Sequence, residues 1–154
     1  MNTIGDIPAH PFFVHFIVVL APLTAILAIL CAVWSAARER LVWLTLALAV
    51  VLTVLTPLAT EAGEWLEHQQ QTRTPILHEH TELGDTAIYF ALGLLVVSLA
   101  LAFLHRWGAR LGERRGVAGV AVAVLAVLIG VASIYQIVRI GDSGARAVWG
   151  SGGS

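Results

Sequence analysis

The sequence predicts an all-α fold, a bundle of four transmembrane helices that run alternately up and down. Hydrophobic residues make up 58% of the 154 residues and charged residues only 12%, whereas a soluble domain carries about 25% charged residues. Four apolar runs are each long enough to cross about 30 Å of hydrocarbon. All five Trp residues lie at or just beyond the ends of these runs, where indole rings prefer the membrane interface.

The first run covers residues 12–34 and begins directly after Pro11. A secretory signal peptide is the alternative interpretation, but residues 1–10 contain no Lys or Arg, and the run is longer than a normal signal core. We therefore expect a retained helix. Cys31 in this run is the only cysteine of the chain, so the chain alone can form neither a disulfide nor a Cys-x-x-Cys redox motif.

The second run covers residues 41–58 and continues into an acidic segment. There, Glu61, Glu64 and His68 follow one another at i, i+3 and i+7, which places them on one stripe of a helix. Pro57 lies above this stripe. Because a carbonyl freed by proline needs a partner inside a membrane, we expect the stripe to face the interior of the bundle.

The third run covers residues 86–104, and its helix is expected to start near Thr74 and Pro75. His78 then begins one polar stripe, whereas His80 lies on another face above Gly84. Gly84 starts a strip of small residues that allows a helix or a flat cofactor to approach closely. Which of the two histidines faces the interior is left open.

The fourth run covers residues 117–138 and ends in a polar segment that contains Arg139. Gly141 and Gly144 are expected to end this helix. Arg139 is the expected counter-charge for the carboxylates of the neighbouring helices. Those carboxylates are Glu61, Glu64, Glu82 and Asp85. Residues 1–149 are interpreted as one membrane domain, and residues 150–154 as a flexible Gly/Ser tail of the kind that cloning leaves behind.

Arginines predict the orientation. The connections after the first and third runs contain six arginines, against three on the opposite side. Because positively charged loops stay in the cytoplasm, both termini and the connection over residues 60–85 are expected to be extracytoplasmic. The six are Arg38, Arg40, Arg106, Arg110, Arg114 and Arg115, and the three are Arg73, Arg139 and Arg146.

In an up-down bundle the start of the first helix, the end of the second, the start of the third and the end of the fourth share one membrane face. That face gathers five of the six histidines, and His105 lies on the other side. Imidazoles and carboxylates at helical spacing are the ligands that zinc, iron or copper would require. The candidate metal ligands are His10, His15, Glu61, Glu64, His68, His78 and His80.

A b-type haem is a second possibility, with His15 and His80 as axial ligands, Gly84 making room for the porphyrin and Arg139 pairing with a propionate. The third possibility is a wet rim, in which these polar residues only hydrate and pair. A proton path across the membrane is disfavoured, because the cytoplasmic halves of the runs contain almost no ionisable residues. The formal net charge of −1 excludes an electrostatic nucleic-acid binder.

Four segments carry a resemblance to a known family. They are His10-Pro11-x-x-Val14-His15-Phe16, the acidic segment around Gly63, His80-x-x-Leu83-Gly84, and Gly141-Asp142-Ser143-Gly144-Ala145. Together they resemble a bacterial family of small four-helix membrane proteins that is classified as a domain of unknown function. Some similar chains carry an added Rieske domain, and this implies respiratory or redox partners. The present chain contains no Cys-His iron-sulphur motif.

The sequence therefore predicts a multi-pass protein of the bacterial inner membrane. We expect it to hold a metal ion or haem near its extracytoplasmic face, for electron transfer or metal handling, and we assign no catalytic residue. The alternative is a non-catalytic accessory subunit of a larger membrane complex, whose polar rim is a docking surface.

Overall fold

The computed structural model describes residues 3–4, 7–69 and 81–149, and the side chains of residues 12–65 and 81–146. A short antiparallel pair, β1 (Thr3–Ile4) and β2 (Ile7–Pro8), precedes α1 (Ala9–Val33) and α2 (Ser35–Gln69). A helical turn over residues 81–85 leads into α4 (Ala87–Trp107), the 3-10 helix η1 (Gly108–Leu111) and α5 (Arg114–Trp149). Within these residues, four helices are long and apolar enough to cross a membrane, which confirms the predicted class.

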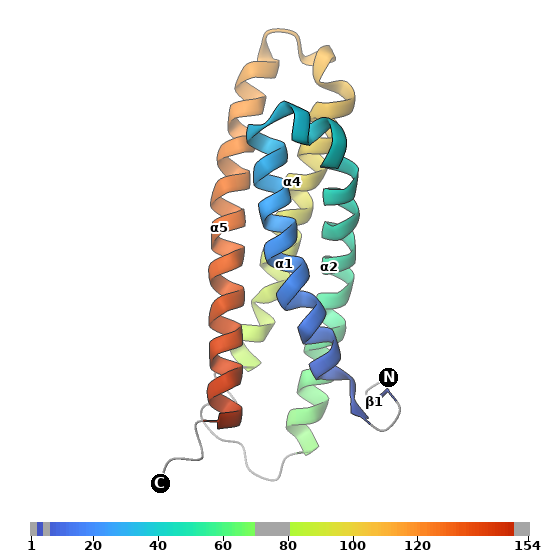
Figure 1. Cartoon of the computed structure of the whole chain (residues 1–154), viewed down its shortest axis with the longest axis vertical. Helices are drawn as coiled ribbons and strands as arrows, with labels where there is room; N and C mark the ends of the chain where they lie inside the picture. The colour runs from blue at the N-terminus through green and yellow to red at the C-terminus, as the bar shows by residue number, and fades with distance from the viewer. Residues whose placement is uncertain (1–2, 5–6, 70–80, 150–154) are drawn as a thin grey trace.

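The helices form an up-down bundle (Figure 1). Helix α1 packs against α2 and α5, and α4 packs against the same two helices from the other side. The start of α1, the end of α2, the start of α4 and the end of α5 lie together at one end of the bundle, which we call the polar end. The α1–α2 and α4–α5 connections lie at the opposite end, which we call the arginine end. The predicted convergence of helix ends is therefore confirmed.

The α1–α2 connection is shorter than the sequence indicated. Only Trp34 separates the two helices, and residues 35–40 already belong to α2. The last carbonyls of a helix lack partners within it, and here Arg38 supplies two. Its Nε donates to the Cys31 carbonyl at 2.7 Å and its Nη2 to the Ala32 carbonyl at 2.8 Å. This double hydrogen bond allows α2 to begin at once.

Helix α5 is longer than predicted. The expectation that Gly141 and Gly144 end it is wrong, because α5 continues to Trp149. An ion pair between Asp142 and Arg146, one helical turn apart on the exposed surface, stabilises this final part.

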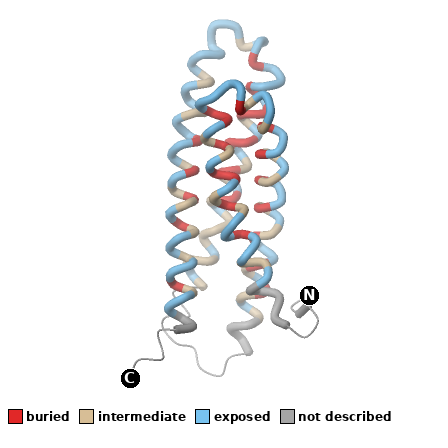
Figure 2. The backbone as a smooth tube through the Cα atoms, viewed as in Figure 1, coloured by how far each residue is buried: buried red, intermediate tan, exposed pale blue. Residues whose placement is uncertain are grey.

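Small residues dominate the core. Ala25, Ala28 and Ala49 are fully buried between the helices, which lets the backbones approach closely. Figure 2 shows buried positions along the inward faces and exposed positions along the outward faces. The outward faces carry large apolar side chains such as Val19, Val96 and Leu128. A surface of this kind is stable only where lipid covers it.

Candidate functional site at the polar end of the bundle

The polar end brings together several residues that the sequence singled out. His15 lies in the second turn of α1, Glu61 and Glu64 lie near the end of α2, and Arg139 lies in the last third of α5. Their shared location follows from the antiparallel order of the helices. All four side chains are exposed, so they form the rim of this end and not its interior.

The remaining predicted ligands fall beyond the described side chains. His10 is in the first turn of α1 and His68 in the last turn of α2, but only their backbones are described. His78 and His80 lie outside the described residues altogether. Within the described part, no three His, Cys, Asp or Glu side chains gather as a metal site would require. The proposed ligand set and the choice between His78 and His80 therefore stay predictions.

The acidic stripe of α2 does not face the interior. Glu61 and Glu64 are exposed, whereas Ala59 and Ala62 are buried, so the expectation of an inward stripe is wrong for both carboxylates. The reason is packing: α2 turns its alanines toward the bundle, because the small side chains fit where helices meet. The two carboxylates remain available to solvent or to an ion at the rim.

Arg139 does not pair with the acidic residues whose side chains the structure describes. Its guanidinium lies 5.9 Å from the centre of the Tyr135 ring, one turn away on α5, and it forms no ion pair with a carboxylate in the described part of the chain. Both residues are on the outer face of α5. The inner face is occupied by Ser133, Gln136 and Ser143, which are buried. The predicted pairing with Glu61 and Glu64 is therefore wrong.

Only part of the strip of small residues that begins at Gly84 packs closely against another helix. A methyl group added at Gly84 would have no neighbouring atom within 4 Å, so none of the described helices is in close contact with Gly84. Ala91, further along the strip, is buried and packs in the core cluster with Ile17 and Leu52. The close helix contact that the sequence predicted occurs at Ala91 and not at Gly84.

A partly buried polar contact at this end was not predicted from the sequence. Gln136 Nε2 of α5 donates to Thr86 Oγ1 at 2.6 Å, and Thr86 Oγ1 donates to the Leu83 carbonyl at 2.7 Å. The contact joins α5 to the beginning of α4. The spacing of Ser133 and Gln136 at i and i+3 was the available signal, because two polar residues on one stripe of an apolar helix indicate an inward face.

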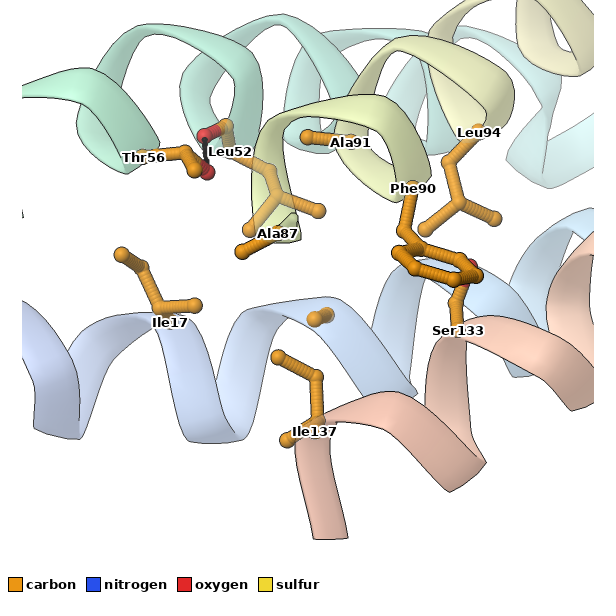
Figure 3. A pocket seen from close by; sticks show the side chains of 10 residues that line it. Ile17, Leu52, Thr56, Ala87, Phe90, Ala91, Leu94, Ser133 and Ile137 are labelled. Atoms are coloured by element: carbon orange, nitrogen blue, oxygen red, sulfur yellow. Dashed lines mark hydrogen bonds between the residues drawn. The ribbon is translucent and has the colours of Figure 1, made fainter. Parts of the chain in front are cut away.

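The interior of this end is tightly packed. Figure 3 shows side chains of α1, α2, α4 and α5 converging, among them Ile17, Thr56, Phe90 and Ser133. The space left between them is about 10 Å³, and a single water needs at least about 10–15 Å³. The described side chains around this cavity therefore fill the space between the four helices.

Comparison with known families supports the resemblance noted in the sequence. The model of a family described as "Predicted membrane protein (DUF2231)" matches residues 6–154. Neither the curated proteins nor the solved structures provide a match. The family match covers nearly the whole bundle, including all four candidate membrane spans. The chain therefore belongs to the DUF2231 family of predicted membrane proteins.

Proposed function

We propose that this protein binds a transition-metal ion at the polar end and serves metal handling or electron transfer in the bacterial inner membrane. The observation that carries the proposal is the convergence of helix ends. The start of α1 contains His10 and His15, and the last turn of α2 contains His68. The segment with His78 and His80 connects α2 to the turn at Thr81. His10, His15 and His68 thus belong to this end, whereas His78 and His80 lie outside the described residues and are assigned to it by the sequence alone.

The packing favours an ion over a haem held between the helices. An ion bound by imidazole and carboxylate needs only a few ligands, within about 2.0–2.2 Å, and these can come from side chains at a rim. A haem would have to lie outside the described helix packing, with His15 and His80 as ligands. A metal ion at a water-exposed rim can also exchange with the solution. Metal handling is therefore the function that we favour.

The orientation belongs to the same proposal. The six arginines counted in the sequence lie at or beside the two connections of the arginine end. Positively charged connections are retained in the cytoplasm, so we place the arginine end there. Both termini and the polar end are then extracytoplasmic, where the site would meet metal ions or redox partners outside the cell.

Metal analysis tests the proposal. Protein purified in detergent without chelator is expected to contain about one zinc, copper or iron per chain. His15→Ala and His68→Ala should each lower metal affinity at least about tenfold, because loss of even a group that only supports a metal ligand costs about 10–100-fold. The matched control is His105→Ala, because His105 is also an exposed helical histidine but lies beside Trp43 near the arginine end. Metal content should also fall below about pH 6, since a ligating imidazole must be neutral.

The outcomes separate the alternatives. A Soret band would identify haem in place of an ion. If both variants still bind the metal, its ligands must instead be sought among Glu61, Glu64, His78 and His80. Protein that contains neither metal nor haem, and that takes up neither on incubation, would refute the proposal.

The second candidate is a non-catalytic accessory subunit of a respiratory or redox membrane complex. Helix α5 supports it, because 17% of an 18-residue apolar window in its candidate span is buried, against 39% of the corresponding window of α1. Its outer face carries Val120, Val124, Leu128 and Val131, all exposed, and could receive a partner helix as well as lipid. Cross-linking from a photoreactive residue at Leu128 in native membranes should then capture one partner protein. Adducts with lipid alone would count against this candidate.

A further inference from the structure

A groove opens at the arginine end, far from the site proposed above. It has a volume of about 430 Å³ and lies between the end of α1 and the beginning of α5, within the usual range of about 300–1,000 Å³ for ligand sites. Its walls are mostly apolar, with two arginines. The lining residues that matter here are Ala32, Arg38, Leu104, Arg115, Gly119 and Val120.

Two glycines of α5 line the groove, Gly116 and Gly119. A methyl group added at Gly116 or at Gly119 would have no neighbouring atom within 4 Å. Elsewhere on the same helix, at Gly130, the equivalent methyl would collide with α1. The two helices therefore touch at Gly130 and leave space at Gly119. The space between them reaches Ala123, which lies about 12 Å along the axis from Arg115 at 1.5 Å per residue.

The charge at the mouth of the groove is not neutralised. Arg38 is half-buried and uses Nε and one Nη2 hydrogen on backbone carbonyls, which leaves its charge and three N–H donors for another acceptor. Arg115 forms no ion pair within the described residues. Gly116 lies in the first turn of α5, where the helix dipole favours an anion.

We propose that this groove binds one anionic phospholipid of the adjacent leaflet. Its phosphate would lie between Arg38 and Arg115, and one acyl chain would follow Val120 and Ala123 toward the membrane centre. The length of the groove, its apolar walls and its uncompensated arginines all match an amphiphile with a negative head. A soluble anion would not use the apolar part, and a zwitterionic lipid would bring its own cation beside the phosphate, which lowers its net attraction to the two arginines.

Replacement of Arg38 would be an ambiguous test, because Arg38 also caps α1. The sharper variant is Gly119→Leu, which fills the groove from an open position. A leucine is a better helix former than glycine, so the fold should not suffer. Gly141→Leu is the matched control, since Gly141 is on the same helix, is exposed and has no atom within 4 Å of an added methyl. Arg115→Gln tests the charge, with Arg106→Gln as its control because Arg106 lies over the Trp107 ring, outside the groove.

Native mass spectrometry of the full chain in detergent, titrated with phosphatidylglycerol or phosphatidylcholine, measures the binding. With about a fivefold gain in affinity per arginine near an anionic headgroup, phosphatidylglycerol should bind about 25-fold more tightly. Gly119→Leu should abolish this first tight binding event and Gly141→Leu should keep it. Arg115→Gln should lower the affinity for phosphatidylglycerol about fivefold without changing the affinity for phosphatidylcholine. Arg106→Gln should change neither affinity.

Three results would overturn the proposal. Equal binding of the two lipids would show that the arginines do not select the head. Unchanged binding in Gly119→Leu would place the lipid elsewhere on the surface. Binding of inorganic phosphate as tight as that of phosphatidylglycerol would show that the arginines hold a soluble anion and that the apolar walls contribute nothing.

Discussion

Helices α1 and α5 are in close contact at Gly130, and replacement of this glycine tests the contact directly. A methyl group at this position would lie 2.8 Å from Ile29 Cδ1 and 3.1 Å from Ile29 Cγ1. Carbon atoms pack best at about 3.5–4.0 Å, so Gly130→Ala forces Ile29 or the helices to move. Overpacking of this kind lowers the free energy of unfolding by about 1–3 kcal/mol. The higher helix propensity of alanine offsets up to about 1 kcal/mol of this loss.

A matched alanine removes the propensity effect from the comparison. Gly141→Ala adds the same methyl to the same helix without a neighbour within 4 Å, so it should gain helix propensity alone. The free energies of unfolding of the two variants should therefore differ by the overpacking cost of about 1–3 kcal/mol. The measurement is reversible unfolding in mixed detergent micelles, followed by circular dichroism.

Ile29→Val provides the second half of the test, because it removes Cδ1, the atom that the new methyl meets first. The double variant should recover about 1 kcal/mol relative to the sum of the single changes, as expected for residues in direct contact. Equal stability of Gly130→Ala and Gly141→Ala, with no coupling to Ile29, would show that α1 and α5 are further apart than described.

Three further predictions concern the two ends of the bundle. Arg139→Ala should lower stability by less than about 1 kcal/mol in the same assay, because it removes only an exposed cation–π contact; a loss of several kcal/mol would indicate a buried partner. Gln136→Leu should cost about 0.6–1.7 kcal/mol, the usual value of an interhelical hydrogen bond in a membrane, and an unchanged stability would show that this bond contributes nothing. In a Cys31→Ala background, an impermeant maleimide should label a cysteine at Gln70 in intact cells and one at Gly112 only after permeabilisation, and the reverse pattern would invert the proposed orientation.

The sequence predicted the helices and their order well, because the membrane permits few alternatives. Every backbone polar group must be satisfied within a span, so an apolar run such as residues 86–104 can only be a helix. Short connections then force neighbouring helices to be antiparallel, and the gathering of helix ends at the polar end follows. The helix limits were less predictable. Hydropathy identifies only the apolar part of a helix, whereas α2 and α5 continue through polar turns beyond the hydrocarbon.

The rotation of each helix about its axis could not be predicted from the same patterns. Glu61 and Glu64 form a regular stripe, and so do Ala59 and Ala62 half a turn away. The polarity of Glu61 and Glu64 suggested that they line a functional interior. In the structure the alanines face inward instead, because their small side chains allow the helices to pack closely. In a chain that is apolar almost all round, the size of side chains decides which face is buried, because lipid covers a large apolar residue as well as a neighbouring helix does.

The chemistry of the buried residues limits what this fold can do. Among the described side chains, the buried polar groups are hydroxyls and one amide, and none is a carboxylate, an imidazole or a Lys or Arg cation. Several of the hydroxyls, such as those of Thr45, Thr56 and Ser98, donate to a carbonyl one turn back on their own helix. They need no water and offer no relay for protons. Among the described residues, the interior therefore offers no ionisable path between the two ends of the bundle, and the metal site proposed above would exchange its ions on the side of the polar end.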